Sequence, residues 1–135
     1  MKGVKSTFGL FARDRRGAAA VEFAIITPVM LASMLGVFEV GRLMYQQSKV
    51  AASAAAGARA VAMYGVSDTT NVTNAINARF TTSERTHLSS NVTTVQISGQ
   101  NFRRIIVTYN FPFLVKFDRR YSSMTITATR YAPAF

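Results

Sequence analysis

The chain has 135 residues and a formal net charge of +10 at pH 7. This length holds one modest domain, and any segment placed in a membrane reduces the folded core further, so a large enzyme is excluded. The absence of cysteine excludes disulfides, thiolate metal sites and cysteine nucleophiles. The excess positive charge would suit a nucleic acid or an anionic membrane, and the distribution of the charges separates these two interpretations.

A basic N-terminal segment, residues 1–17, precedes a long apolar stretch with few charges. Its charged side chains are Lys2, Lys5, Arg13, Arg15 and Arg16 against Asp14. Between Gly17 and Gly41 only Glu22 and Glu39 carry charge. As a helix this stretch would measure about 37 Å, enough to cross about 30 Å of bilayer hydrocarbon. We therefore predict a transmembrane helix at residues 18–41. The basic segment should stay in the cytoplasm and the rest of the chain should lie outside it.

The helix is predicted to continue beyond the membrane as an alanine-rich extension, residues 42–64. This segment contains no proline, and it reaches Gly65, which can adopt the left-handed conformation that ends many helices. One helix over residues 18–64 follows, with Pro28 as a point where it can bend.

Residues 65–135 are predicted to form a small exported α+β domain. Asp68, Thr69 or Thr70 can cap a short helix, and Val72, Ile76 and Phe80 recur along one face of it. Alternating apolar residues then predict three strands, carried by Val95 and Ile97, by Ile105, Val107, Tyr109 and Phe111, and by Met124, Ile126 and Ala128. A hairpin turn is expected at residues 98–101. The predicted fold class is therefore α+β: a long N-terminal helix, a short helix and a roughly three-stranded antiparallel sheet.

The most informative motif lies where the basic and apolar stretches meet. Arg15, Arg16 and Gly17 are followed by the sequence AAAVEF, residues 18–23. Glycine lets the backbone lie extended in a protease cleft, and the arginines, with Arg13, hold the site near anionic headgroups. This motif resembles a type IV prepilin processing site. The resemblance implies that a prepilin peptidase cuts between Gly17 and Ala18, and that Glu22 and Phe23 belong to the recognised mature start.

Glu22 is a charged residue inside the predicted membrane span. If the span is centred near Val29, Glu22 lies about 10 Å from the midplane, inside the hydrocarbon. Insertion scales give about 2.5–3.5 kcal/mol for a charge at the centre of a span, so a partner is expected. The prepilin resemblance implies that this partner is the amine of Ala18 in a neighbouring subunit. The other interpretation is that Glu22 lies near the interface, or is protonated, and pairs with nothing.

Further segments narrow the resemblance. GVFEVGRLMY at residues 36–45, the alanine-rich helix, and the late segments RIIVTYNFPFL and SMTITATRYA look like the TadE-like pseudopilins of tight-adherence (Flp, type IVc) pilus systems. TadF-like proteins share the N-terminal pattern. The resemblance implies a minor, non-enzymatic pilus component in the bacterial inner membrane, with adhesion and biofilm formation as the wider setting. The implied partners are the prepilin peptidase, other pilins and pseudopilins, the inner-membrane assembly platform and membrane lipid.

The residues outside this motif predict little chemistry. Glu39 and Arg42 lie three apart on one helical face and are expected to form an interfacial ion pair. His87 is predicted to be a solvated loop residue with no nucleophile to serve. The remaining acids show neither metal-ligand nor dyad spacing, so no metal, cofactor or catalytic residue is expected.

Two alternatives remain open. Arg103, Arg104, Arg119 and Arg120, with nearby aromatic side chains, could make a membrane-anchored or secreted module that binds DNA or another polyanion. Such arginines are usually solvated, so nucleic acid is not expected as a partner. The N-terminus could also be an ordinary signal peptide cleaved near residues 52–54. That position lies too far beyond the apolar run.

Overall fold

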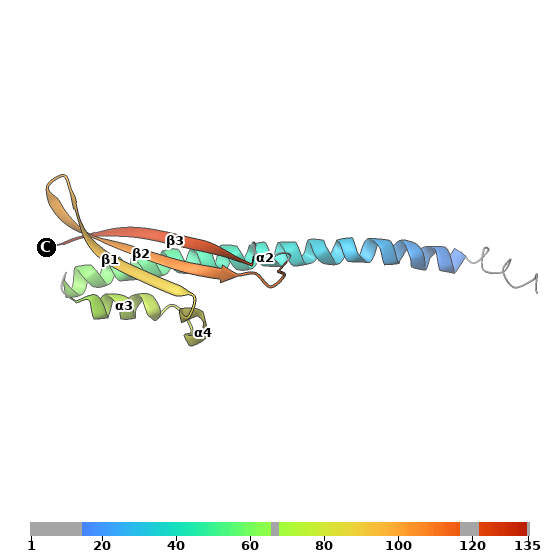
Figure 1. Ribbon diagram of the computed structural model, residues 1–135, viewed down its shortest axis with the longest axis horizontal. Coiled ribbons are helices and arrows are strands. Elements are labelled where there is room, and N and C mark those ends of the chain that lie inside the picture. Colours follow the sequence, from blue (N-terminus) through green and yellow to red (C-terminus); the bar gives the residue numbers. More distant parts are fainter. Residues whose placement is uncertain (1–14, 66–67, 117–121, 135) are drawn as a thin grey trace, which may run out of the picture. The chain divides into compact units, whose positions relative to one another are not determined.

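A computed structural model describes residues 15–65, 68–116 and 122–134 (Figure 1). The chain divides into two compact units, Met1–Phe38 and Glu39–Phe135. The elements are α2 (Arg15–Tyr64), α3 (Thr69–Asn77), α4 (Thr82–Arg85), β1 (Leu88–Ile97), β2 (Gln100–Pro112) and β3 (Ser123–Pro133). The predicted α+β fold class is confirmed.

Helix α2 is one continuous element of 50 residues that includes Pro28. It begins three residues before the predicted start, at Arg15, and it ends where the sequence predicted. Gly65 adopts a φ of +82°, and its backbone N–H donates to the carbonyl of Val61 at 2.9 Å. Glycine takes this left-handed conformation without steric penalty, so Gly65 stops the helix.

The described part of the first unit, residues 15–38, presents apolar side chains outward. Phe23, Ile25 and Val37 are 70%, 68% and 75% exposed. Helix α2 is long and apolar enough to cross a membrane, and none of its most apolar window is buried. A core helix of a soluble protein would bury such a stripe, so these exposures favour a membrane span.

The second unit contains an antiparallel sheet in the order β1-β2-β3. Ser98 and Gly99 connect β1 to β2 with φ values of +53° and +79°. Two consecutive positive φ values match the tight two-residue turns whose twist suits a hairpin. The turn was predicted over residues 98–101, and its last two residues belong to β2. Strand β1 begins at Leu88, well before the predicted Val95. The sequence did not predict this early start because serine, threonine and asparagine interrupt the apolar alternation of the strand.

The C-terminal half of α2 packs against one face of this sheet (Figure 1). The core contains side chains from α2, α3, β2 and β3, together with Phe80, which follows α3. They are Val50, Ala54, Ala60, Val61, Val72, Ile76, Phe80, Ile105, Val107, Tyr109, Phe111, Ile126 and Ala132. Each large apolar side chain that is fully buried stabilises the fold by about 1.5–3 kcal/mol. The predicted apolar face of the short helix is confirmed for Val72 and Ile76, which are buried, whereas Phe80 is buried but lies beyond the end of α3.

Helix α4 was not predicted. Thr81 and Glu84 form a capping box at its start, a pattern that the sequence carries. His87 follows the helix in an exposed turn, as predicted.

Candidate functional site

The predicted processing and assembly residues lie on the first turns of the described helix. Gly17, Ala18, Glu22 and Phe23 belong to α2, and all four are exposed. Nothing lies within 4 Å of a Cβ atom placed on Gly17. Arg13 lies outside the described residues, as do the side chains of Arg15 and Arg16. The predicted residues that the structure describes therefore share one accessible helical segment.

Gly17 is helical, although a protease cleft generally requires an extended backbone. The first four N–H groups of a helix have no intrahelical acceptor, so its first turn is the least stabilised part. Glycine weakens it further, by about 1 kcal/mol relative to alanine. The turn around Gly17 can therefore unwind at little cost.

Glu22 differs from the other polar side chains of the apolar stretch. The hydroxyls of Thr27 and Ser33 donate to the carbonyls of Phe23 and Val29 at 2.7 and 2.9 Å, so the helix itself satisfies them. Glu22 is the only charged residue between Gly17 and Phe38. Among the residues that the structure describes, it has no ion-pair or hydrogen-bond partner. A carboxylate in this position would gain from a cation supplied by another molecule.

The predicted pair between Glu39 and Arg42 is confirmed, with 2.7 Å between Nη1 of Arg42 and Oε2 of Glu39. The pair is more than an isolated surface contact. The other oxygen of Glu39 accepts a hydrogen bond from the backbone N–H of Leu114. The Arg42 guanidinium lies 5.0 Å from the centroid of the Phe111 ring. These contacts hold the end of β2 against α2 directly after the uncharged residues 23–38.

A second polar cluster was missed by sequence reasoning. Nζ of Lys49 lies 2.7 Å from both carboxylate oxygens of Glu84, and Nε2 of Gln46 donates to Glu84 at 2.9 Å. The N–H and hydroxyl of Thr81 also donate to Glu84, each at 2.8 Å. The capping box gave a local signal for Glu84, but its partners on α2 lie 35 and 38 residues away. This cluster ties α4 to α2 and is structural.

Desolvation by itself would raise the pKa of Glu84, but the hydrogen bonds from Lys49, Gln46 and Thr81 outweigh it. They lower the pKa from its ordinary value of 4.5 to about 2. A carboxylate whose pKa falls on folding stabilises the folded state above its ordinary pKa, and this stabilisation disappears as the pH falls through the lowered value. The contribution of Glu84 is therefore lost between pH 4.5 and pH 2.

Glu84→Gln is expected to lower the stability of the second unit at pH 7 by about 1 kcal/mol, since both charged partners stay partly in contact with water. The difference from the unmodified protein should shrink as the pH falls from 4.5 to 2. Thermal unfolding of the full chain in detergent, recorded across this pH range, measures it. Lys49→Met serves as the companion variant. In a protein that carries Lys49→Met, the loss of stability caused by Glu84→Gln should be smaller. A difference that stays constant over the range would contradict the role of Glu84.

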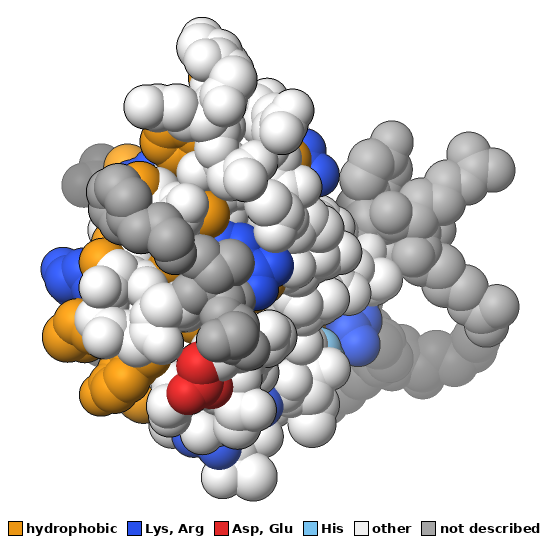
Figure 2. Space-filling view, turned by 90° about the vertical axis from the view of Figure 1, so that its left-hand side faces the viewer, with side chains coloured by type: hydrophobic (Ala, Val, Ile, Leu, Met, Phe, Trp, Pro, Cys, Tyr) orange, Lys and Arg blue, Asp and Glu red, His pale blue; other side chains and the backbone are white. Residues whose placement is uncertain are grey.

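The predicted polyanion-binding arginines do not form one patch in the described part of the chain. Arg103 and Arg104 are consecutive residues of β2, so they point to opposite faces of the sheet. Their guanidinium groups donate to Thr94 and Thr93 of β1 at 3.0 and 3.3 Å. On the face drawn in Figure 2, basic side chains lie in separate places among polar and apolar ones. Residues 119 and 120, the other predicted arginines, lie outside the described residues.

Within the described ranges, no three His, Cys, Asp or Glu side chains are grouped so that they could hold a metal ion. The His87 ring packs edge-on against Tyr109, with 6.3 Å between the ring centroids.

Comparison with known proteins agrees with the N-terminal motif. The model of the family described as TadE-like protein matches residues 17–59. The match begins at Gly17 and covers Glu22, the apolar stretch and most of the alanine-rich extension. Comparison with curated proteins and with solved structures gave no match. The family is a structural, pilus-related one, and it implies association with other components of a pilus system. Residues 17–59 are thus similar to the TadE-like family, and they fit a membrane-anchored component associated with a tight-adherence (Tad) pilus.

Proposed function

We propose that this protein is a minor pseudopilin of a tight-adherence (Flp) pilus. In this proposal residues 18–41 anchor it in the bacterial inner membrane, with the basic N-terminus in the cytoplasm and residues 65–135 outside. A prepilin peptidase removes residues 1–17, and other pilins, pseudopilins and the assembly platform are its partners. The observation that carries the proposal is Glu22, a charged side chain without a partner among the described residues, exposed on an apolar helix that starts beside Gly17.

Cleavage after Gly17 would supply the missing cation. It would create an α-amine on Ala18, which is positively charged near neutral pH. In a lipid environment both the amine and the Glu22 carboxylate are costly to leave unpaired. Pairing the amine of one subunit with Glu22 of the next would satisfy both charges, and it would fix the axial position of one helix against the other.

The processing step gives the first test. We expect the mature chain to begin at Ala18 in cells with an active prepilin peptidase, and at Met1 in cells without one. Gly17→Val should block cleavage, because the branched side chain opposes close backbone approach, whereas Gly17→Ala should be cleaved more efficiently than Gly17→Val. Mass spectrometry of the N-terminal peptide reports the start, and an immunoblot reports the extent of cleavage.

The open surroundings of Gly17 make this test specific. Since nothing lies within 4 Å of a Cβ atom at this position, neither variant should disturb the described fold. Lost cleavage would then reflect the peptidase rather than misfolding. A mature start near residue 55, or equal cleavage of the valine variant and the unmodified protein, would contradict the proposed processing.

A further inference from the structure

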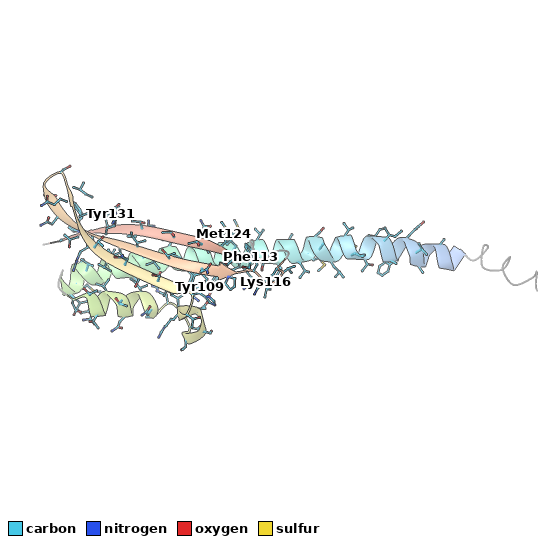
Figure 3. All side chains as sticks on the ribbon, viewed as in Figure 1. Tyr109, Phe113, Lys116, Met124 and Tyr131 are labelled. Atoms are coloured by element: carbon cyan, nitrogen blue, oxygen red, sulfur yellow. The ribbon has the colours of Figure 1, made fainter. Side chains whose placement is uncertain are left out.

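The segment that follows β2 presents two exposed apolar side chains. Phe113 packs against Phe111, with 5.6 Å between the ring centroids, and its N–H donates to the carbonyl of Ser122 at 3.1 Å. The next two side chains point away from the core, since Leu114 is 60% and Val115 is 37% exposed. Figure 3 shows Phe113 and Lys116 at this end of the sheet. The loop is thus held by Phe113 while Leu114 and Val115 stay accessible.

A hydrogen bond sets the height of this loop along α2. The backbone N–H of Leu114 donates to Oε1 of Glu39, and the other carboxylate oxygen pairs with Arg42. Glu39 directly follows the uncharged run of residues 23–38. If that run spans the bilayer, as the proposed function holds, Glu39 lies at the outer boundary of the hydrocarbon. Leu114 then lies at that boundary too.

The surroundings of the loop match a lipid interface. On α2, Val40 and Met44 are 54% and 65% exposed within about one turn of Glu39. Lys116, also exposed, directly follows the apolar pair. Its aliphatic stem can lie along apolar surface while its amine reaches lipid phosphates. Apolar side chains beside a flexible cation are typical of segments that lie in the headgroup region of a membrane.

We propose that Leu114 and Val115 insert into the extracytoplasmic leaflet and form a second membrane contact of this protein. The occupant of this surface is the bilayer itself, because the hydrogen bond to Glu39 places the loop at the height of the bilayer surface. The inference rests on the proposed membrane span. It adds that the second unit is held against the membrane by its own loop as well as by α2, and that this contact must break when the subunit leaves the membrane.

The absence of cysteine makes a site-specific test possible. The full chain with Leu114→Cys is labelled at the new thiol with an environment-sensitive fluorophore. It is then reconstituted in vesicles of phosphatidylethanolamine and phosphatidylglycerol. Its emission is challenged with a water-soluble quencher, and separately with lipids that carry a quencher near the headgroup. Two matched sites serve as references. Val29→Cys lies in the apolar stretch, and Ile97→Cys lies on an exposed part of β1 next to the hairpin turn.

The proposal predicts that the fluorophore at position 114 is quenched by the lipid-borne group and protected from the aqueous one, whereas position 97 shows the reverse. Equal aqueous quenching at positions 114 and 97 would overturn it, provided that position 29 is protected from the aqueous quencher. Protection at position 114 without lipid quenching would also overturn it, because another copy of the chain would then cover the loop. Aqueous quenching at position 29 would instead contradict the membrane span and thus the proposed function.

Discussion

Gly57→Leu is expected to destabilise the second unit by about 3 kcal/mol or more, the largest stability effect of any single change considered for this chain. A Cβ atom at Gly57 would lie 3.0 and 3.1 Å from Cγ1 and Cδ1 of Ile76, and 3.3 Å from Cγ2 of Ile105. Both isoleucines are fully buried, so a leucine side chain has no room to enter. Thermal unfolding of the full chain in detergent should show a midpoint lowered by more than about 10 °C.

Two further variants separate crowding from helix propensity. Gly41 lies on the same helix with nothing within 4 Å of an added Cβ, so Gly41→Leu should leave the unfolding midpoint unchanged or raise it. Gly57→Ala should be nearly neutral, because about 1 kcal/mol gained in helix propensity offsets a shift of a few tenths of an ångström by Ile76. Equal midpoints for the two leucine variants would contradict the close packing at Gly57.

The elements that the sequence predicted share strong local periodicity. Helix α2 carries an apolar stretch and then an alanine-rich one, and β2 alternates Ile105, Val107, Tyr109 and Phe111. Such patterns arise because each element must bury its apolar side chains, whichever partner it packs against. The start of β1 was missed because its serine, threonine and asparagine residues obscure the alternation. Gly57 was also passed over, although a glycine inside an alanine-rich helix is itself a signal of close packing.

The contacts that the sequence did not predict join residues far apart in the chain. Glu84 contacts Lys49 across 35 residues, and Leu114 contacts Glu39 across 75. No local pattern encodes such a pair, because its geometry depends on how the sheet packs on α2. The processing motif is the opposite case. The roles proposed for Gly17 and Glu22 rest on their position between a basic and an apolar segment, so they could be inferred from the sequence alone, and they stay predictions.

Glu22→Ala is expected to have the largest functional effect. The substitution removes a charge that is costly in the isolated helix, so membrane insertion should be unchanged or improved. Cleavage after Gly17 should continue, because the scissile bond and the basic residues are retained. Assembly should fail, because the amine of Ala18 loses the carboxylate that would neutralise it and set the register of neighbouring helices. Processing, membrane content and surface piliation are measured in one strain.

The controls distinguish a contact between subunits from other roles of Glu22. Thr27→Ala removes a polar group that donates to the carbonyl of Phe23 in its own helix, so this variant should keep normal piliation. Glu22→Asp keeps the negative charge, so this variant should retain part of the piliation. If Glu22 paired only with the amine of its own chain, removing it would change the charge of a single subunit and leave the register between subunits intact.

Surface piliation of the Glu22→Ala strain therefore tests the proposed assembly role most directly. Pili sheared from cells that carry this variant, from Thr27→Ala cells and from unmodified cells are quantified against equal amounts of processed protein in the membrane. The pseudopilin assignment predicts a loss of at least tenfold for Glu22→Ala, which corresponds to about 1.4 kcal/mol of lost interaction, and no loss for Thr27→Ala. Normal piliation by Glu22→Ala, with processing and insertion intact, would contradict the assignment.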